Sequence, residues 1–337
     1  MANASNEGSA RTPKGPASKP LVIDVHAHIV VPEVLDWAYQ HSMFAQGVVG
    51  GKGMPEEFMT PMTDMNRRFK DMDAMGVDIQ VISPSILQQC SYFADPQEAL
   101  KYERRGNDRI AETVAKHPDR LLGLGSVPMQ DTDVAVQELT RCMGELGLRG
   151  VIISSNINGT ELGDERLRPF WAAAEKLGAA VFIHPAGSAD PRLRKHRMVI
   201  TIGQPLEEAL AQASLVYEGI MDAFPKLKIF IAHGGGFLPF YTGRVDNDYR
   251  LGRGAQQLKG DFSSYLPRFY YDTVLFDPGM LDYLATKVPA SQLLLATDYP
   301  FAEKRPVEFV RRAKNISQAD QDAVLGLNAA RMLGVSV

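Results

Sequence analysis

The chain has 337 residues, of which 45% are hydrophobic and 23% are charged, a composition typical of a globular protein with a large core. Its net charge of -4 at pH 7 argues against a nucleic-acid-binding surface. No apolar run is long enough to span a bilayer, and the two cysteines lie far apart, so we expect a cytoplasmic protein with no membrane partner.

The first segment of the chain differs in composition from the rest. Residues 1–20 are rich in Ala, Ser, Gly, Asn, Pro and Lys and lack the apolar stretch of a secretory signal, which predicts a disordered tail. Residues 21–337 are predicted to form a single domain. Within it, residues 29–61 are too long and mixed for a simple connection, and they are either an active-site lid or a surface insertion.

Elsewhere in the chain, apolar runs alternate with segments of helical periodicity. Eight runs are predicted to be strands: 21–28, 77–83, 120–127, 148–154, 179–184, 228–233, 269–272 and 293–298. Helices are predicted at 62–75, 95–116, 131–146, 164–177, 204–224, 236–249 and 279–286, with further helical segments to the C-terminus. This order predicts an α/β fold, a (β/α)8 TIM-type barrel. The alternative is a doubly wound open sheet, but no Gly-x-Gly-x-x-Gly follows the first strand.

Four of the seven histidines fall at the ends of predicted strands, where barrel active sites gather. His26 and His28 are two residues apart and therefore project from one face of the first strand, either as half of a metal site or as two hydrogen-bonded histidines. His184 ends the fifth strand, His233 the sixth, and Asp298 the eighth. Their occurrence in this order predicts that they share one metal ion.

Three neutral nitrogens and one carboxylate would leave a divalent metal with positive charge, enough to lower the pKa of a bound water towards neutrality. A histidine beside that water could take or return a proton. The glycines at 234–236 are expected to let a substrate approach closely and to present backbone N–H donors. The remaining histidines, at 41, 117 and 196, are predicted to lie in loops or at a helix end.

Several motifs together resemble the metal-dependent amidohydrolase superfamily. They are IDVHAH at 23–28, MDAMGVD at 72–78, GSVP at 125–128, FIHP at 182–185, HGGG at 233–236 with GRVD at 243–246, ATDYPF at 296–301 and NAAR at 328–331. Within that superfamily the chain looks most like the branch of 2-amino-3-carboxymuconate-6-semialdehyde decarboxylase and related hydroxyaryl-acid decarboxylases. The resemblance runs from residue 23 almost to the C-terminus.

The resemblance implies roles for single residues. It makes His26, His28, His184 and Asp298 ligands to one divalent metal, usually zinc and sometimes manganese. It leaves His233 off the metal as an acid/base. Binuclear members of the superfamily carry a carboxylated lysine on the fourth strand, and residues 148–154 contain no lysine, which favours a mononuclear site.

Arg244, eleven residues beyond His233, corresponds to an arginine that in the resembling decarboxylase reaches a neighbouring subunit's site and binds the substrate carboxylate. This implies a homodimer; the alternative is a surface salt bridge with Asp246 or Asp248. The chain departs from the family at a second substrate-binding arginine, where alignment places Glu56 or Glu57. Arg67 and Arg68 come later and are predicted to be helical.

Our main hypothesis is a metal-dependent enzyme that removes CO2 non-oxidatively from an unsaturated or aromatic carboxylic acid, with His233 and Asp298 handling the proton. The second hypothesis uses the same site to hydrolyse an amide, lactone or C–C bond, or to hydrate a double bond. The third, a non-catalytic binding or scaffold protein, is disfavoured by the complete set of strand-end ligands.

Overall fold

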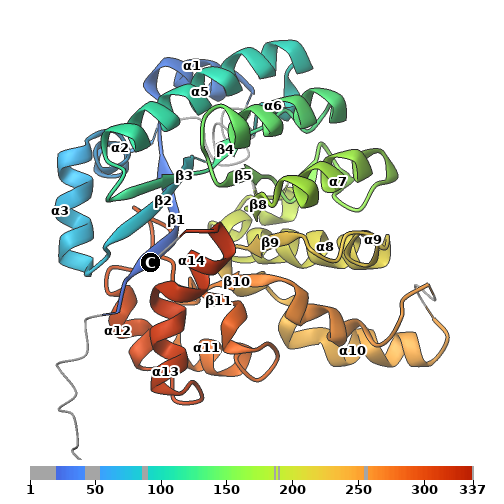
Figure 1. The fold of residues 1–337 in the computed structure, drawn as a ribbon. Helices are drawn as coiled ribbons and strands as arrows, with labels where there is room; N and C mark the ends of the chain where they lie inside the picture. The colour runs from blue at the N-terminus through green and yellow to red at the C-terminus, as the bar shows by residue number, and fades with distance from the viewer. Residues whose placement is uncertain are drawn as a thin grey trace, which may run out of the picture.

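Parallel strands form a closed ring at the centre of the molecule, and helices cover the outside of the ring (Figure 1). The computed structural model describes residues 20–41, 54–85, 90–185, 187–188, 190–253 and 257–335, so all but one residue of the predicted tail lies outside the described residues. The strands of the ring are β1 (Ile23–Ile29), β2 (Ile79–Pro84), β3 (Leu121–Gly123), β4 (Gly125–Ser126), β5 (Gly150–Ile153), β8 (Ala180–Ile183), β9 (Lys228–Ile231), β10 (Tyr270–Asp272) and β11 (Leu293–Leu294).

The ring closes at two junctions. Strands β1, β2 and β3 form one run, and β4, β5, β8, β9, β10 and β11 form the other. The predicted strand 120–127 is interrupted at Leu124, whose backbone N–H donates to Ile82, and there the chain changes partner from β2 to β5. At the other junction Ala27 pairs in parallel with Tyr299, just beyond β11. Since β3 and β4 share one position, the strands fill the eight positions of the predicted TIM-type barrel.

The strands are buried on both faces, as expected for parallel strands covered by helices. One set of side chains packs between strands and helices, and a smaller set fills the barrel interior. In the interior, Phe182 of β8 stacks on Phe230 of β9 with ring centroids 4.2 Å apart. The ring of His26 lies edge-on to Phe182 at 4.8 Å. Apolar packing therefore forms the floor beneath the strand-end histidines.

The described helices are α1 (Pro32–His41), α2 (Glu56–Thr63), α3 (Met65–Met75), α5 (Pro96–Lys116), α6 (Thr132–Gly144), α7 (Arg168–Leu177), α8 (Gln204–Tyr217), α9 (Ile220–Ala223), α10 (Leu238–Arg250), α11 (Pro278–Leu284), α12 (Pro306–Arg311), α13 (Gln318–Asp322) and α14 (Asn328–Leu333). Short helical turns accompany them: η1 (Cys90–Phe93), η2 (Glu165–Leu167), η3 (Pro191–Leu193), η4 (Val199–Gly203), η5 (His233–Gly235), η6 (Phe262–Arg268), η7 (Ala290–Gln292) and η8 (Ala323–Leu327). A small antiparallel hairpin, β6 (Asn156–Ile157) with β7 (Thr160–Glu161), lies apart from the ring.

The predicted helix 62–75 is two helices. Asp64 separates them because its side chain accepts hydrogen bonds from the backbone N–H groups of Asn66 and Arg67, which makes it the N-cap of α3. Gly76 ends α3 with φ of +73°, a conformation that favours glycine. The predicted helix 204–224 is likewise divided into α8 and α9.

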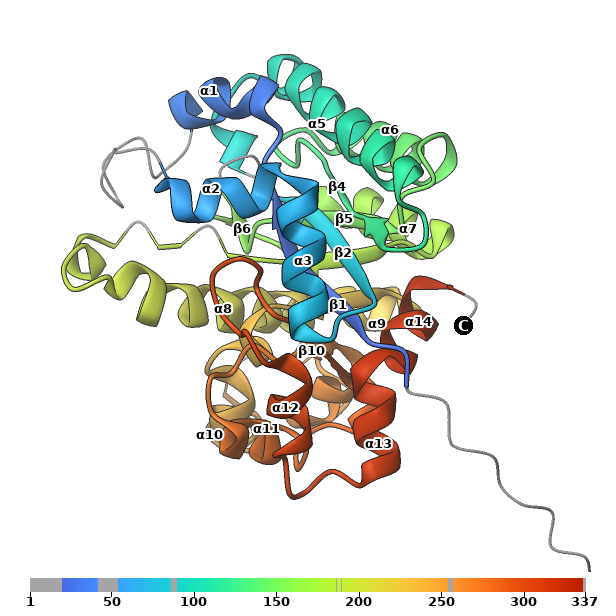
Figure 2. The same cartoon turned by 90° about the vertical axis from the view of Figure 1, so that its left-hand side faces the viewer.

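The insertion after β1 contains helices at both ends. Figure 2 shows α1 beside α5 and α2 beside α3 on one side of the barrel. Trp37 of α1 is buried, stacks on Tyr102 of α5 at 4.3 Å and donates to Glu98. Residues 42–53 lie outside the described residues, so a lid function stays a prediction.

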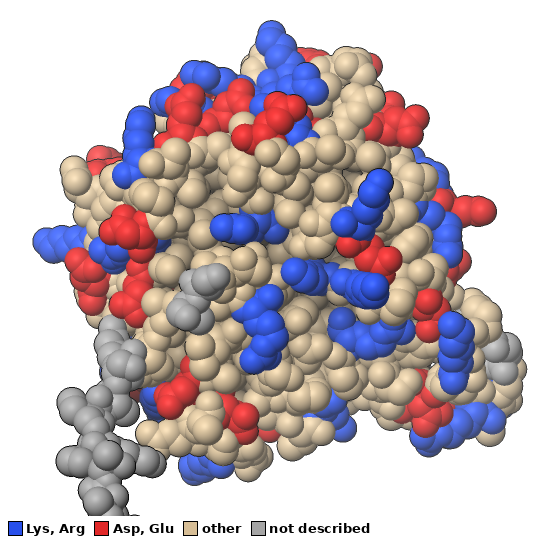
Figure 3. All heavy atoms as spheres, viewed as in Figure 1, with Lys and Arg blue, Asp and Glu red and all other residues tan. Residues whose placement is uncertain are grey.

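Basic and acidic side chains lie side by side along the top of Figure 3, over α1 and α5. Arg105 and Arg109 of α5 each pair with Glu33 of α1, at 3.0 and 2.9 Å. No described helix combines the length and apolar character needed to cross a bilayer.

Candidate metal centre

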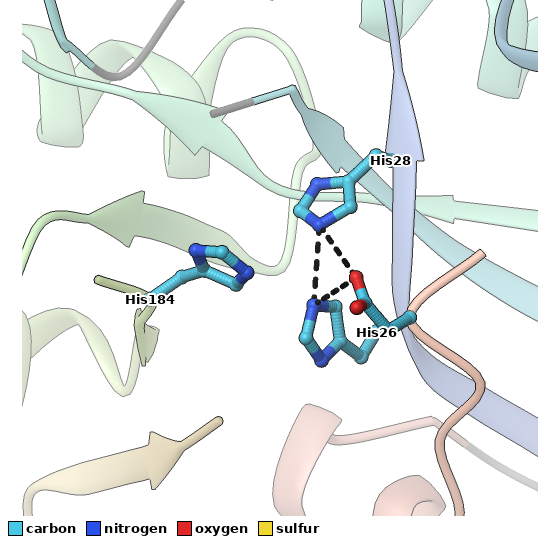
Figure 4. A group of neighbouring side chains, drawn as sticks. His26, His28 and His184 are labelled. Carbon is cyan, nitrogen blue, oxygen red and sulfur yellow. Dashed lines mark hydrogen bonds and ion pairs between the residues drawn. The ribbon is translucent and has the colours of Figure 1, made fainter. Parts of the chain in front are cut away.

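His26 and His28 project from one face of β1 into the mouth of the barrel, as their two-residue spacing predicted (Figure 4). Their Nε2 atoms are 3.2 Å apart. Both side chains are buried. One oxygen of Asp298, Oδ1, lies 3.1 Å from each of these two nitrogens. Two imidazole nitrogens and a carboxylate oxygen therefore converge on one small volume.

His184 completes the cluster from the opposite wall, directly after β8 (Figure 4). Its ring centroid is 4.9 Å from that of His26 and 5.0 Å from that of His28. One ligand atom from each of His26, His28, His184 and Asp298 lies within 4.8 Å of all the others. This spacing lets a single ion contact all four side chains.

Outer contacts fix the orientation of two of these rings. Nδ1 of His26 donates to Oδ2 of Asp272, at the end of β10, over 2.7 Å. Nδ1 of His184 donates to the carbonyl of Pro185 over 3.1 Å. Each bond orients its ring so that Nε2 faces the cluster, which is how metal-binding histidines are held. Asp272 was missed by sequence reasoning, although it ends the predicted strand 269–272.

The ionisation of the cluster suits a cation. Burial lowers the pKa of His28, and burial together with the neighbouring imidazoles lowers the pKa of His184 well below its ordinary value. Burial alone would raise the pKa of Asp298, but His26 and His233 hold it well below its usual range. Two neutral imidazoles and an ionised carboxylate are the forms that bind divalent metals. Burial lowers the pKa of His26, but Asp298 and Asp272 outweigh this effect and raise it to about 9, so a bound cation would displace one proton from this ring.

His233 stands at the edge of the cluster, where its Nε2 is 3.9 Å from Oδ2 of Asp298. Asp298 therefore faces the other imidazoles with one oxygen and His233 with the other. Nδ1 of His233 donates to the buried carboxylate of Glu208 on α8. Burial lowers the pKa of His233, but Glu208 and Asp298 outweigh this effect and raise the pKa well above its ordinary value.

Two positions of the site have strained backbones. His233 has φ of +50° and Asp298 has φ of +51°, in the left-handed region that non-glycine residues seldom adopt. Such strain is found most often at functional sites, where the surrounding structure maintains it. Here the two residues with strained backbones are the two whose side chains face each other at the edge of the cluster.

The prediction that the glycines at 234–236 present backbone N–H donors to a substrate is wrong, whereas the close approach of a substrate to them stays a prediction. The backbone N–H of Gly234 donates to Asp272, and the N–H of Gly236 donates to the carbonyl of His233, so these donors are used within the protein. A Cβ on Gly236 would lie 2.1 Å from the carbonyl oxygen of Pro205. Glycine is needed there because this turn packs closely against the start of α8.

A buried network of polar side chains connects the chain segments that contain the residues of the cluster. Arg68 of α3 donates to Oε1 of Gln80 over 2.8 Å and to the carbonyl of His28, and its guanidinium stacks over Tyr299 at 4.7 Å. Gln80 donates to Asp24, which also accepts from the backbone N–H and hydroxyl of Thr297. Arg68 is helical, as predicted, but its burial in this network was not.

The other singled-out residues lie away from the cluster. Arg244 is exposed on α10 and forms no hydrogen bond or ion pair with any residue that the structure describes, so the predicted alternative of a salt bridge with Asp246 or Asp248 is not observed. His41 ends α1, His117 follows α5 and His196 is exposed in a loop, as predicted. The strand β5 contains no lysine.

Comparison with known proteins agrees with this geometry. A family model described as amidohydrolase matches residues 23–335. The 2-amino-3-carboxymuconate-6-semialdehyde decarboxylase of Dictyostelium discoideum is 34% identical over 332 residues, which cover 94% of this chain and 92% of that protein. The crystal structure of 5-carboxyvanillate decarboxylase from Sphingomonas paucimobilis matches with a TM-score of 0.86 and 28% identity, over 94% of this chain and all of that one.

A dihydroxybenzoic acid decarboxylase from Polaromonas sp. JS666, solved with manganese and the inhibitor 2-nitroresorcinol, matches with a TM-score of 0.81 and 26% identity, over 94% of this chain and 97% of that one. That manganese-bound relative and the His/Asp cluster together support a divalent metal in this protein. Since the family model spans nearly all of the described domain, this chain belongs to the amidohydrolase family.

Proposed function

We propose that this protein is a metal-dependent decarboxylase that removes CO2 non-oxidatively from an aromatic or unsaturated carboxylic acid. The observation that carries the proposal is the position of Asp298. One of its oxygens lies 3.1 Å from the Nε2 atoms of both His26 and His28, and the other lies 3.9 Å from Nε2 of His233. A carboxylate placed in this way links a metal site to a group that can transfer a proton.

In this proposal His26, His28, His184 and Asp298 hold one divalent ion, either zinc or manganese. When bound, the ion supplies positive charge that attracts an anionic substrate. Three neutral imidazoles and one carboxylate suit either metal. The absence of lysine from β5 supports a site for one ion rather than two.

His233 is the proposed acid/base. Its raised pKa keeps the ring protonated near neutral pH, and Glu208 accepts from Nδ1, so the proton on Nε2 is the one available for transfer. The C–C bond to the carboxylate breaks and CO2 leaves. The proton of His233, transferred directly or by way of the Asp298 carboxylate, ends on the carbon that carried the carboxylate. The step balances as one substrate carboxylate plus one proton giving arene or alkene plus CO2.

We further propose that the protein is a homodimer in which Arg244 binds the substrate carboxylate in the partner's site. Two features support this. Arg244 is exposed and makes no ion pair with the described residues, and a guanidinium binds a carboxylate through two parallel hydrogen bonds. In addition, α8 contacts both η4 and α10, and these three elements expose large apolar side chains, a feature of association surfaces: Ile202, Leu206, Leu210 and Tyr241.

Released CO2 is the test of the activity. The protein, loaded with manganese or with zinc, is incubated with a panel of hydroxybenzoates and carboxymuconate semialdehydes, and CO2 is measured. Turnover of any of these acids with stoichiometric CO2 supports decarboxylation. Turnover of lactones or anilides without CO2 would favour hydrolysis at the same site instead.

Subunit mixing tests the role of Arg244. The variants Arg244→Ala and His233→Ala are each expected to be inactive as homodimers. After their subunits are exchanged, a mixed dimer contains one site with an intact His233 and an Arg244 supplied by the partner. Activity recovered on mixing supports the shared site, and no recovery despite demonstrated exchange contradicts it.

A further inference from the structure

A cavity of about 510 Å³ opens from the proton-transfer side of the metal centre. His233 and Asp298 line its inner end. From there it runs between η4, the start of α10 and α11. A substrate group that occupies this cavity is therefore bonded to the carbon that receives the proton, or lies beside that carbon.

The outer part of the cavity is hydrophobic. We call it the apolar arm and define it by Phe237, Phe240, Phe276, Met280 and Leu284. Phe240 and Phe276 are exposed at its rim, whereas Leu284 is buried at its base. A surface of this kind favours hydrocarbon, because removing each CH2 from water favours binding about fourfold.

Polar groups are few in this cavity. Apart from His233 and Asp298, the described polar side chains that line it are Thr201, Gln204 and Tyr283. Gln204 donates to the carbonyl of Pro185 and Tyr283 to the carbonyl of Pro239. No described lysine or arginine lines the cavity. A second carboxylate on the substrate would lose water there without gaining a cation from this chain, which is unfavourable. In the shared site proposed above, the partner's Arg244 binds the carboxylate that is removed.

The volume of the cavity also favours a substrate with additional hydrocarbon. A cavity of about 150 Å³ is enough to bind benzene. The volume beside His233 is more than three times larger. A single-ring acid without substituents would leave most of the apolar arm in contact with water.

We propose that the substrate carries one carboxylate, on a hydroxylated aromatic ring, and a hydrocarbon substituent of several carbons that occupies the apolar arm. This inference rests on the proposed decarboxylase function and names its substrate class. The reaction leaves the substituent unchanged: the bond to the carboxylate carbon breaks, CO2 leaves, and a proton takes its place on the ring.

Matched acids test the proposal in the manganese-loaded protein. We expect kcat/KM for 2,4-dihydroxy-6-pentylbenzoate to exceed that for 2,4-dihydroxybenzoate at least tenfold, with 4-hydroxyisophthalate, a dicarboxylate, the poorest of the three. Equal values for the first two acids, or the highest value for the dicarboxylate, would overturn the proposal and leave decarboxylation itself standing.

A binding measurement separates the two proposals. Calorimetry compares 5-pentylresorcinol with resorcinol on the manganese-loaded protein, and we expect the pentyl compound to bind at least tenfold more tightly. If it does while no acid of the panel releases CO2, the apolar arm is supported and the decarboxylase function fails. If it binds no more tightly, the apolar arm is refuted whatever the activity.

Two similarly exposed side chains provide a variant and its control. Met280, 46% exposed, lines the apolar arm, and Leu327, 44% exposed, does not line the cavity. Met280→Ser is expected to lower the preference for the pentyl compound several-fold, since a polar group replaces the hydrocarbon contact. Leu327→Ser is expected to leave the preference unchanged. An equal effect of both variants would contradict the placement of the substituent.

Discussion

Arg68 and Arg67 are adjacent on α3 but have opposite surroundings, which makes them a matched pair for mutation. Arg68 is buried, and Arg68→Gln would remove its hydrogen bonds to Gln80 and to the carbonyl of His28. Each acceptor left without a partner costs about 1–3 kcal/mol. With two such acceptors, we therefore expect the free energy of unfolding to fall by about 2–6 kcal/mol, or roughly 3–8 °C in Tm for a chain of this size.

Arg67 supplies the control. Its side chain is 51% exposed and pairs with Asp71 one turn along the helix, a contact that solvent screens and that adds little to stability. Arg67→Gln should therefore leave Tm almost unchanged. Both variants are measured by thermal unfolding in the metal-free and metal-loaded states.

Arg68→Gln should also weaken metal binding, because Arg68 holds the backbone of His28 and stacks on Tyr299, beside Asp298. Loss of groups that support metal ligands typically costs 10–100-fold in affinity. Competition with a chelator measures this directly. An Arg68→Gln protein with the Tm and metal affinity of Arg67→Gln would refute the role we give to the buried network.

Other predictions concern two buried glutamates. Glu208→Gln should retain metal but lower kcat by about 10–100-fold, because the neutral amide no longer stabilises the protonated ring of His233; metal loss or full activity would contradict this. Burial raises the pKa of Glu103 to about 7, against the hydrogen bonds that it accepts from Ser91 and Ser126. Because the folded-state pKa lies above the ordinary value of 4.5, the contribution of Glu103 to stability is greatest below pH 4.5 and falls as the pH rises to about 7, by about 3 kcal/mol. In Glu103→Gln this part of the pH dependence of Tm should disappear, and an unchanged profile would refute the assignment.

The sequence allowed the cluster to be predicted because its members share one signal: each lies at the end of a predicted strand. A barrel brings the ends of its strands together, so placing the strands also placed His26, His28, His184 and Asp298. The family match confirmed the superfamily that these motifs indicated.

The supporting residues were harder to predict. Glu208 lies within a helical segment, where a glutamate ordinarily faces solvent, and only the packing of α8 against the turn at His233 shows that it is buried. Arg68 is similar, since nothing local in the sequence distinguishes it from the exposed Arg67. Such burial depends on contacts between distant segments, which periodicity in a single sequence does not contain.

The predicted boundaries of strands and helices were wrong where tertiary contacts override the local sequence pattern. The predicted strand 293–298 is apolar up to Ala296, but only Leu293–Leu294 pairs as β11. Beyond it the chain crosses to β1, where Tyr299 pairs with Ala27 and Asp298 takes its left-handed conformation. The division between α2 and α3 did have a local signal, the N-cap Asp64, which the apolar spacing alone obscured.

The central claim is that distant segments of the chain hold one divalent ion at the mouth of the barrel. Metal analysis of the purified protein by mass spectrometry tests it most directly, with His184→Ala as the comparison. We predict one zinc or manganese ion per chain in the wild-type protein and none in the variant. Two ions per chain, or an undiminished metal content in His184→Ala, would contradict the claim.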